Sequence, residues 1–280
     1  MQPAIEHVSD TALMVAACRA HETELDCGLI RDPFARQLAG ERGMAILADT
    51  PSRVFMQFGI GVRTRSMDEL LAVAIAGGVD TVVNLGAGLD TRPWRLDLPP
   101  ELLWIEVDFP DMLAYKSRAL ADAKPHCRLQ RMSADLNDPA ARAAALHRGQ
   151  GRSLLMSEGL LMYLPGETVE ALSKEALDPF RHWLLDVNSA ETMRMVHGDF
   201  LRHIDHVRAE SHLDGPEILE TVQRAGWNVT EKRTYLGAGG AIVAPDRVAL
   251  LMKELGITPD PDAPRPQDPC SGVWLFRKAS

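Results

Sequence analysis

The sequence has few cysteines and no long apolar run. Its four cysteines, at positions 18, 27, 127 and 270, include no Cys-x-x-Cys pair. This spacing favours neither a zinc site nor a disulfide framework, so we expect reduced thiols and no bound metal. The longest apolar segment, residues 70–79, is far shorter than the roughly 20 residues that cross a bilayer.

Clustered basic residues are also missing. The formal net charge is −9, and no run of Lys and Arg could neutralise a phosphate backbone, so we expect no nucleic-acid partner. The first thirty residues carry several acidic side chains rather than a basic end followed by an apolar core. We therefore expect a cytoplasmic protein that does not enter a membrane.

The most informative stretch is residues 80–92, in which an apolar, β-branched strand leads into a glycine-rich turn. Gly86 and Gly88 allow positive φ and let the backbone approach a ligand. A second apolar strand ends in Asp108, 22 positions after Gly86, which is the spacing of a strand–helix–strand unit. The Asp108 carboxylate can accept hydrogen bonds from two ribose hydroxyls. The pattern predicts a nucleotide-like cofactor bound at Gly86, Ala87, Gly88 and Asp108.

Dinucleotides and S-adenosylmethionine (SAM) are the two common cofactors for such a turn. A dinucleotide turn has Gly or Ala at its last position, where a helix N-terminus meets the pyrophosphate. Here that position is Thr91, followed by Arg-Pro-Trp. This bulky continuation favours SAM, which has no phosphate. An NAD(P)-dependent dehydrogenase is the alternative, although neither Tyr115 nor Tyr163 is followed by the Lys of a Tyr-x-x-x-Lys pair.

Five ordered blocks resemble the leucine carboxyl methyltransferase family, which includes bacterial O-methyltransferases of polyketide and other secondary metabolism. The blocks are residues 11–20 with 32–35, 83–92 with 94–96, 106–110 with Lys116, 135–136, and 158–165. The resemblance spans roughly residues 9–165 and implies a class I SAM-dependent methyltransferase.

The fold class that follows is α/β, with a doubly wound, mostly parallel seven-stranded sheet. We expect a helical N-terminal cap over residues 1–65 and a methyltransferase domain over residues 66–280, with a cap insert at about 188–215. Alternating apolar runs predict strands at 81–85, 103–107, 127–132, 153–157 and 182–187, and helices at 66–77, 110–122, 139–147 and 167–179. Further helices are expected at 217–225 and 248–255. Strands at 227–230 and 272–276 would form the antiparallel edge pair that the family resemblance implies.

The resemblance also implies roles for three residues beyond the glycine-rich turn. It places Asp135 and Leu136 at the adenine end of the cofactor and Glu158 beside the methyl donor. Other roles are open: Asp135 could cap the helix that begins at Pro139, and Glu158 could cap amides of its own loop. Asp108 could likewise be an exposed carboxylate at a strand end.

Two arginines are candidates for the α-carboxylate of SAM, because a planar guanidinium matches a carboxylate bidentately. The family has one basic residue in its N-terminal segment and one in the helix before the first strand. These positions correspond to Arg19 and Arg63. Arg65 is the alternative to Arg63.

The expected reaction is direct methyl transfer to an oxygen of a small molecule. Glu158 and Tyr163 are the catalytic candidates, but neither is a convincing base. A carboxylate acceptor needs no base, whereas a phenol or enol does, so a carboxylate is favoured. Methionines at 156, 162, 193 and 195 would suit a flat, apolar, polyketide-like acceptor.

Three further possibilities concern metal binding and function. His197, His203, His206 and His212 lack the spacing and the companions of a metal site, although one of them could serve as a base. The family name raises the possibility of a carboxyl methyltransferase that acts on a protein C-terminus. A non-catalytic SAM-binding protein is the third possibility. The oligomeric state cannot be predicted from these patterns.

Overall fold

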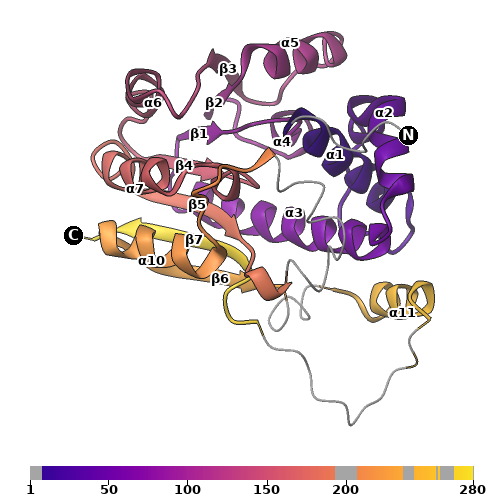
Figure 1. Ribbon diagram of the computed structural model, residues 1–280. Helices are drawn as coiled ribbons and strands as arrows, with labels where there is room; N and C mark the ends of the chain where they lie inside the picture. Colours follow the sequence, from indigo (N-terminus) through magenta and orange to yellow (C-terminus); the bar gives the residue numbers. More distant parts are fainter. Residues whose placement is uncertain (1–7, 193–206, 236–242, 257, 259–267, 280) are drawn as a thin grey trace.

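The computed structural model describes residues 8–192, 207–235, 243–256, 258 and 268–279. Within these residues three long helices precede a sheet that carries helices on both faces (Figure 1). The helices are α1 (Val8–Glu24), α2 (Ala35–Asp49), α3 (Arg53–Ala76), α4 (Arg92–Arg95), α5 (Pro110–Ala119), α6 (Pro139–Leu146), the 3₁₀ helix η1 (Leu161–Tyr163), α7 (Gly166–Glu175), α10 (Gly215–Ala225) and α11 (Pro245–Glu254). The strands are β1 (Thr81–Leu85), β2 (Leu103–Asp108), β3 (Arg128–Ser133), β4 (Ser153–Ser157), β5 (His182–Val187), β6 (Trp227–Thr234) and β7 (Gly272–Lys278).

The sheet has seven strands in the described residues, in the order β3-β2-β1-β4-β5-β7-β6. Strands β1 to β5 pair in parallel, whereas β7 pairs antiparallel with both β5 and β6. The doubly wound α/β class and the antiparallel edge pair predicted above are therefore confirmed. The chain winds outward in opposite directions from β1 and β4, and a crevice at the carboxyl ends of such strands is where open α/β sheets bind ligands.

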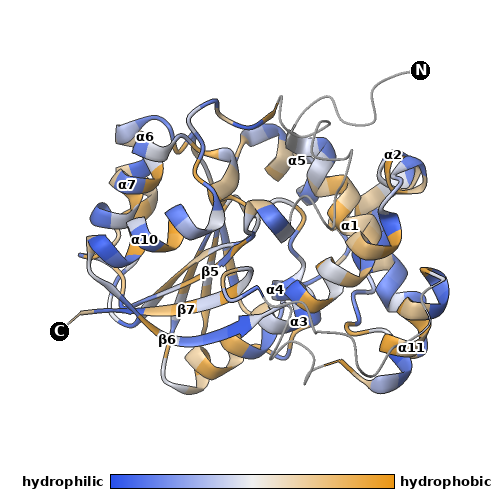
Figure 2. Cartoon of the chain, turned by 60° about the horizontal axis from the view of Figure 1, so that its bottom comes forward, coloured by the Kyte–Doolittle hydropathy of each residue, from blue (hydrophilic) through white to orange (hydrophobic). Residues whose placement is uncertain are grey.

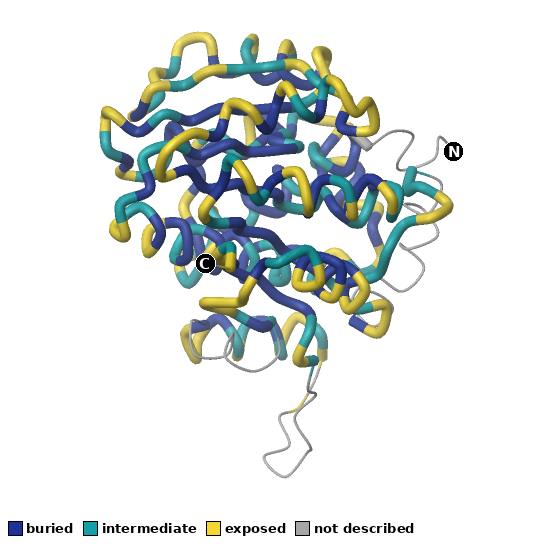
Figure 3. Tube along the Cα trace, turned by 90° about the vertical axis from the view of Figure 1, so that its left-hand side faces the viewer, coloured by how far each residue is buried: buried dark blue, intermediate teal, exposed yellow. Residues whose placement is uncertain are grey.

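Side chains of the central strands alternate between two apolar layers. Val83 and Leu85 face α6, α7 and α10, whereas Val82 and Leu154 face the C-terminal half of α3. The apolar residues gather along the strands and the inward faces of the helices (Figure 2). The central strands β1, β2, β4 and β5 are almost wholly buried, whereas β3 and most of β6 are not, and the buried backbone lies at the centre of the molecule (Figure 3). Helices on both faces bury both sides of the sheet, which explains why the central strands read as continuous apolar runs.

Helix α3 is longer than predicted. It begins at Arg53, just after the Thr50-Pro51 break, and continues without interruption to Ala76. Its N-terminal half packs against α1 and lines a cavity, so its apolar pattern there does not follow a single buried stripe. The helix thus crosses residue 65, where the sequence suggested a boundary between cap and domain, and that division remains a prediction.

Two other elements differ from the sequence-based expectation. Strand β6 extends to Thr234 because its backbone pairs with β7 across a bulge between Val229 and Glu231, although its exposed polar residues give no hydropathy signal. The glycine-rich turn leads into α4, a single turn that begins at Arg92. In the part of the chain that the structure describes, no helix combines the length and the hydropathy that crossing a membrane requires.

Helix α6 provides a test of local stability. Its N-cap is Asp138, whose side chain accepts the amide N–H groups of Ala140 (2.8 Å) and Ala141 (2.9 Å). The alternative that Asp135 caps this helix is therefore wrong. We expect Asp138→Ala to lower the free energy of unfolding by about 1 kcal/mol in urea denaturation. The control Asp135→Ala should cost less, because Asp135 accepts only the Asn137 amide in its own turn. Equal losses for both variants would contradict this assignment of the cap.

Candidate functional site

A cavity of about 490 Å³ lies at the carboxyl ends of β1, β2 and β4 and is also lined by α1, α3 and α11. All of the residues predicted to bind the cofactor or to act in catalysis line it: Arg19, Arg63, Gly86, Ala87, Gly88, Asp108, Asp135, Leu136, Glu158 and Tyr163. The structure therefore brings together side chains that are up to 144 positions apart in the sequence. A cavity of this size can hold a cofactor-sized ligand.

The glycine-rich turn and Asp108 form one hydrogen-bonded unit. Gly86 and Gly88 have φ values of 62° and 40°, and a Cβ on Gly86 would lie 2.8 Å from the Leu160 side chain. The Gly88 amide donates to Asp108 Oδ2 (2.6 Å) and the Phe109 amide donates to Oδ1 (2.7 Å). Burial raises the pKa of Asp108 above its ordinary value, and the two amides act in the opposite direction. Each carboxylate oxygen keeps a lone pair for a further donor.

Asp135 and Leu136 lie where β3 leads into α6. Asp135 is exposed at the cavity, and its Oδ1 accepts the Asn137 amide (2.9 Å). Leu136 is only 6% exposed and packs with the core of the sheet. Together they place a carboxylate oxygen beside an apolar side chain at the cavity.

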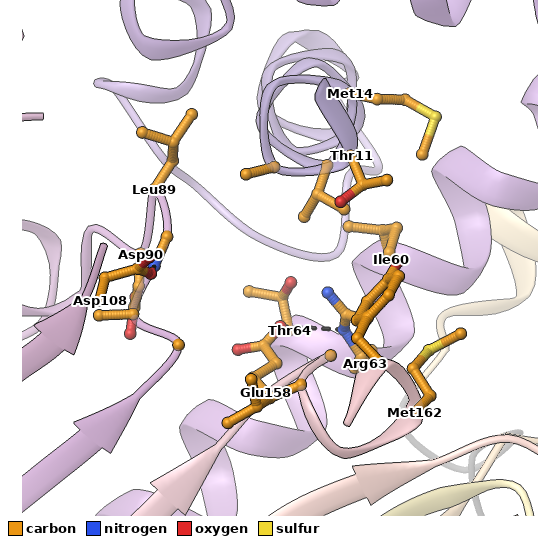
Figure 4. Close-up of a pocket in the computed structure, with 18 of the residues that line it drawn as sticks. Thr11, Met14, Ile60, Arg63, Thr64, Leu89, Asp90, Asp108, Glu158 and Met162 are labelled. Carbon is orange, nitrogen blue, oxygen red and sulfur yellow. Dashed lines mark hydrogen bonds and ion pairs between the residues drawn. The ribbon is translucent and has the colours of Figure 1, made fainter. Parts of the chain in front are cut away.

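Glu158 lies between two buried guanidinium groups. Its Oε1 accepts from Arg63 Nε (2.9 Å), and its Oε2 accepts from Arg92 Nη1 (2.7 Å). Figure 4 shows Arg63 and Glu158 pointing toward each other across the cavity wall. Burial alone would raise the pKa of Glu158, but Arg92 and Arg63 lower it to about 2. Glu158 is therefore a fixed anion and a very weak base at neutral pH.

The loop amide next to Glu158 has a different acceptor. Gly159 N–H donates to Asp186 Oδ1 (2.5 Å), and Asp186 Oδ2 lies 3.4 Å from Arg63 Nη1. The Glu158 carboxylate is thus paired with Arg63 and Arg92, and the amide of the loop after β4 is bound by Asp186 instead. Burial raises the pKa of Asp186, and Arg63 acts in the opposite direction.

The structure distinguishes the two candidate arginines of α3, Arg63 and Arg65. Arg63 lines the cavity and its side chain is 12% exposed, whereas Arg65 pairs with Glu69 (2.6 Å) and is 51% exposed. Residues two positions apart lie on nearly opposite faces of a helix, so only one of them can face the cavity. Arg63 is the cavity residue.

Arg19 ties α1 to the glycine-rich turn. Its Nε donates to Asp32 Oδ2 (2.8 Å) and its Nη2 donates to the Leu89 carbonyl oxygen (2.6 Å). The same Asp32 oxygen accepts from Thr91 Oγ1 (2.7 Å). Two of the three guanidinium nitrogens are thus used to hold the turn, a role that the sequence did not reveal.

Tyr163 ends η1 and lines the cavity beside α1. Burial raises its pKa, and a side-chain hydrogen bond with Thr11 acts in the opposite direction. Tyr235, which follows β6, also lines the cavity, and burial raises its pKa well above the ordinary value. Both phenols are therefore protonated at neutral pH, so they can form hydrogen bonds but cannot serve as bases.

Several polar residues of the site were not assigned a role from the sequence. Asn84 Nδ2 donates to Asp90 Oδ2 (2.9 Å), and Arg92 Nε pairs with Asp68 Oδ1 (2.7 Å). Asp186 and Asn84 had a detectable signal, since each is a polar residue inside an otherwise apolar strand. The pairing with Asp68, from the middle of α3, had none.

Of the four histidines singled out in the sequence, His212 lies in the described part of the chain. His197, His203 and His206 lie outside the described residues, as do Met193 and Met195. His212 has its Nδ1 2.6 Å from the Ala209 carbonyl oxygen. The described residues contain no group of three potential metal ligands.

The fold and the site define an α/β protein that presents a glycine-rich turn and the Asp108 carboxylate to one cavity. Residues 12–176, more than half of the chain, match the model of the leucine carboxyl methyltransferase family. The chain belongs to that family.

Individual relatives agree with this assignment. A predicted SAM-dependent methyltransferase of Rhodococcus jostii (strain RHA1) is 37% identical over 225 residues, which cover 76% of this chain and 74% of that protein. One from Streptomyces coelicolor is 39% identical over 174 residues, 58% of this chain, and the match spans 62% of that relative's length. The solved structure of a DUF574 family protein from Streptomyces avermitilis has a TM-score of 0.59 at 18% identity and covers 96% of this chain and 97% of its own, which supports the fold.

The paired arginines predict how acid affects stability. Because the pKa of Glu158 is lower in the folded than in the unfolded chain, its contribution is fully present above the unfolded-state pKa and is lost as the pH falls toward 2. Glu158→Gln should lower the free energy of unfolding by about 3 kcal/mol at neutral pH, and the difference should shrink as the pH falls from about 4.5 toward about 2. Urea titrations at several pH values measure it.

Glu170→Gln is the matched control, because Glu170 pairs with Lys174 on the exposed face of α7. Its effect should be much smaller and nearly independent of pH. A difference between Glu158→Gln and the parent that stays constant down to pH 3 would contradict the assigned pKa shift.

Proposed function

We propose that this protein is a SAM-dependent O-methyltransferase that acts on a small, polyketide-like molecule, with a carboxylate as the favoured acceptor. Family membership and the names of the relatives support SAM as the cofactor. The observation that carries the choice of acceptor is the absence, among the described residues lining the cavity, of a histidine or any other evident base at the transfer end.

The residues at the strand ends fit SAM. Asp108 would accept the ribose hydroxyls with its remaining lone pairs, and the positive φ of Gly86 and Gly88 lets the turn pass close to the cofactor. Asp135 and Leu136 would flank the adenine. Arg63, held by its two carboxylate partners, would present its guanidinium to the α-carboxylate.

The charge of the lining also suits SAM. Glu158 is ionised and remains so at neutral pH, so it provides a negative charge near the strand ends where a sulfonium would lie. Bound SAM supplies a methyl group on a positively charged sulfur, which is already an activated donor. The protein then has to position the acceptor and exclude water.

The rest of the cavity is suited to an apolar acceptor. It is lined by aromatic and aliphatic side chains of α3, η1 and α11, among them Phe55, Phe58, Ile60, Met162 and Leu251. Such a surface removes water from an anionic acceptor and from the sulfonium together. Methyl transfer between them neutralises both charges, so a site of low polarity favours the transition state over the separated, hydrated ions.

The possible acceptors differ in whether they need a base on the protein. Glu158, with a pKa of about 2, accepts a proton poorly, and the Tyr163 and Tyr235 phenols stay protonated at neutral pH. A carboxylic acid is ionised at neutral pH without help, whereas a phenol or enol has to lose a proton during or before transfer. These properties favour the carboxylate.

Other functions receive less support. Family membership sets the dehydrogenase alternative aside. A protein C-terminus as acceptor would have to enter a cavity of about 490 Å³ that also holds the cofactor, which favours a small molecule. A non-catalytic SAM-binding protein would have no need of an apolar chamber beside the methyl donor. A cytoplasmic location without nucleic-acid or membrane partners remains a prediction.

The cofactor assignment predicts a specific loss of affinity. Asp108→Asn should weaken SAM binding by about tenfold to a hundredfold, because it removes the charge from a carboxylate that accepts the ribose hydroxyls. Asp111→Asn is the control. It removes the same charge from the first turn of α5, and Asp111 does not line the cavity. Isothermal titration measures both affinities. Equal affinities for the two variants would exclude this role for Asp108.

The acceptor assignment is tested with matched pairs of aromatic carboxylic acids and phenols and with radiolabelled SAM. We expect methyl esters from the acids, and a kcat/KM that is flat between about pH 6 and 8, because neither the acceptor nor a protein base titrates there. If only the phenols are methylated, at a rate that rises with pH, the acceptor is a hydroxyl group and not a carboxylate. SAM binding without any transfer across a broad acceptor panel would favour the non-catalytic alternative.

A further inference from the structure

Helix α11 is attached to the N-terminal helices by a buried ion pair. Arg247 Nη2 lies 2.5 Å from Glu22 Oε1, and both side chains are fully buried. Glu22 belongs to α1, so the contact joins residues 225 positions apart. Figures 1 and 2 both place α11 next to α3, on the side away from α6, α7 and α10.

The surroundings are built to hold this pair. Glu22 Oε2 also accepts the Leu29 amide (3.0 Å), and the Arg247 guanidinium lies 5.1 Å from the centre of the Phe58 ring. In the middle of α3, Gly61 leaves room for Glu22, because a Cβ there would lie 3.0 Å from the carboxyl carbon. A glycine within a helix is unfavourable. Its presence here is explained by the Glu22 carboxylate that packs against it.

The same face of α11 continues into the cavity. Leu251 lies one turn after Arg247, so the two side chains share a face, and Leu251 is 8% exposed and lines the cavity. Phe58 stacks on Arg247 and also lines the cavity. Val248 packs in a small apolar cluster with Val62 and does not line the cavity.

None of the residues assigned to the cofactor comes from α11. Those residues lie at the carboxyl ends of β1 to β4, in α1 and near the middle of α3. Leu251 and Phe58 instead belong to α11 and to the N-terminal half of α3. They belong to the part of the lining left for the acceptor.

We infer that α11 is the acceptor-side wall of the cavity, that the Glu22–Arg247 pair fixes its position, and that Leu251 with Phe58 sets the size of acceptor that fits. The identity of the acceptor and the assignment of this side of the cavity to it rest on the proposed function, whereas the contacts of α11 with the cavity do not. Burying two charges is costly, and their directional contact fixes α11 in one position more strictly than apolar packing would.

The experiment uses the full chain loaded with S-adenosylhomocysteine. Benzoate, naphthoate and anthracene carboxylate, three acids of increasing size, are titrated calorimetrically. Leu251→Trp should lower the affinity for the two larger acids about tenfold or more while changing the affinity for benzoate little. Leu251→Ala should raise the affinity for anthracene carboxylate relative to that for benzoate, compared with the parent protein. Val248→Ala, on the same helix, should leave the order of affinities unchanged. Affinity for S-adenosylhomocysteine should stay within about twofold in all variants.

Anilinonaphthalene sulfonate is a second probe, whose fluorescence reports entry into an apolar chamber. If the acids do not bind but Leu251→Trp prevents binding of this dye, the inference that α11 is a wall of the cavity is supported and the carboxylate acceptor is rejected. If Leu251→Trp and Leu251→Ala alter neither the order of the acids nor dye binding, the inference is overturned. It is also overturned if the parent protein binds none of these probes, since an open apolar chamber would admit at least one.

The ion pair is tested separately by limited trypsin digestion. Arg247→Met leaves Glu22 buried without its cation, so α11 should detach more often and cleavage after the exposed Lys253 should accelerate about tenfold or more. The double variant Glu22→Gln with Arg247→Met should reverse much of this effect, because no lone charge remains. An unchanged cleavage rate in Arg247→Met would show that the pair does not hold the helix.

Discussion

The site depends on a chain of alternating charges at the carboxyl end of the sheet. Arg63 and Arg92 enclose Glu158; Arg63 also contacts Asp186, and Arg92 contacts Asp68, which pairs in turn with Arg95. Each of these ions would cost several kcal/mol to bury alone, so all have to be present and correctly placed for any to be buried. The chain joins α3, α4, the loop after β4 and the end of β5. The shape of the cavity therefore follows from electrostatic compensation as much as from apolar packing.

A second polar contact makes the N-terminal helices part of the site. Arg19 and Asp32 connect α1 and the segment before α2 to Leu89 and Thr91 of the glycine-rich turn. A change in the position of α1 would thus be transmitted to the turn, and a cofactor bound at the turn would stabilise α1. The N-terminal segment is energetically coupled to the sheet, even though its sequence looks like a separate helical region.

The sequence reveals the parts of the site that are local. The apolar strand, the two glycines and Asp108 lie within one strand–helix–strand unit, so their spacing alone predicts that they meet. It does not show which of Arg63 and Arg65 faces inward, because that depends on how α3 is rotated against the sheet. Nor can it show that α11 contacts α1. That contact joins residues far apart in the chain, and the signal for it was a glycine in the middle of α3 whose partner was unknown.

The division of roles within the cavity has a physical basis. Charged groups that must persist, such as Glu158, are fixed at the strand ends by guanidinium partners that keep the carboxylate ionised. The part of the lining proposed for the acceptor consists of apolar side chains, and the Glu22–Arg247 ion pair behind it is fully buried. An acceptor in this chamber would therefore meet little charge from the apolar side chains around it, and the sulfonium would be the cation that it approaches. Attraction between an anionic acceptor and that cation would orient the reacting oxygen toward the methyl group. The chamber itself would then only have to fit the acceptor and exclude water.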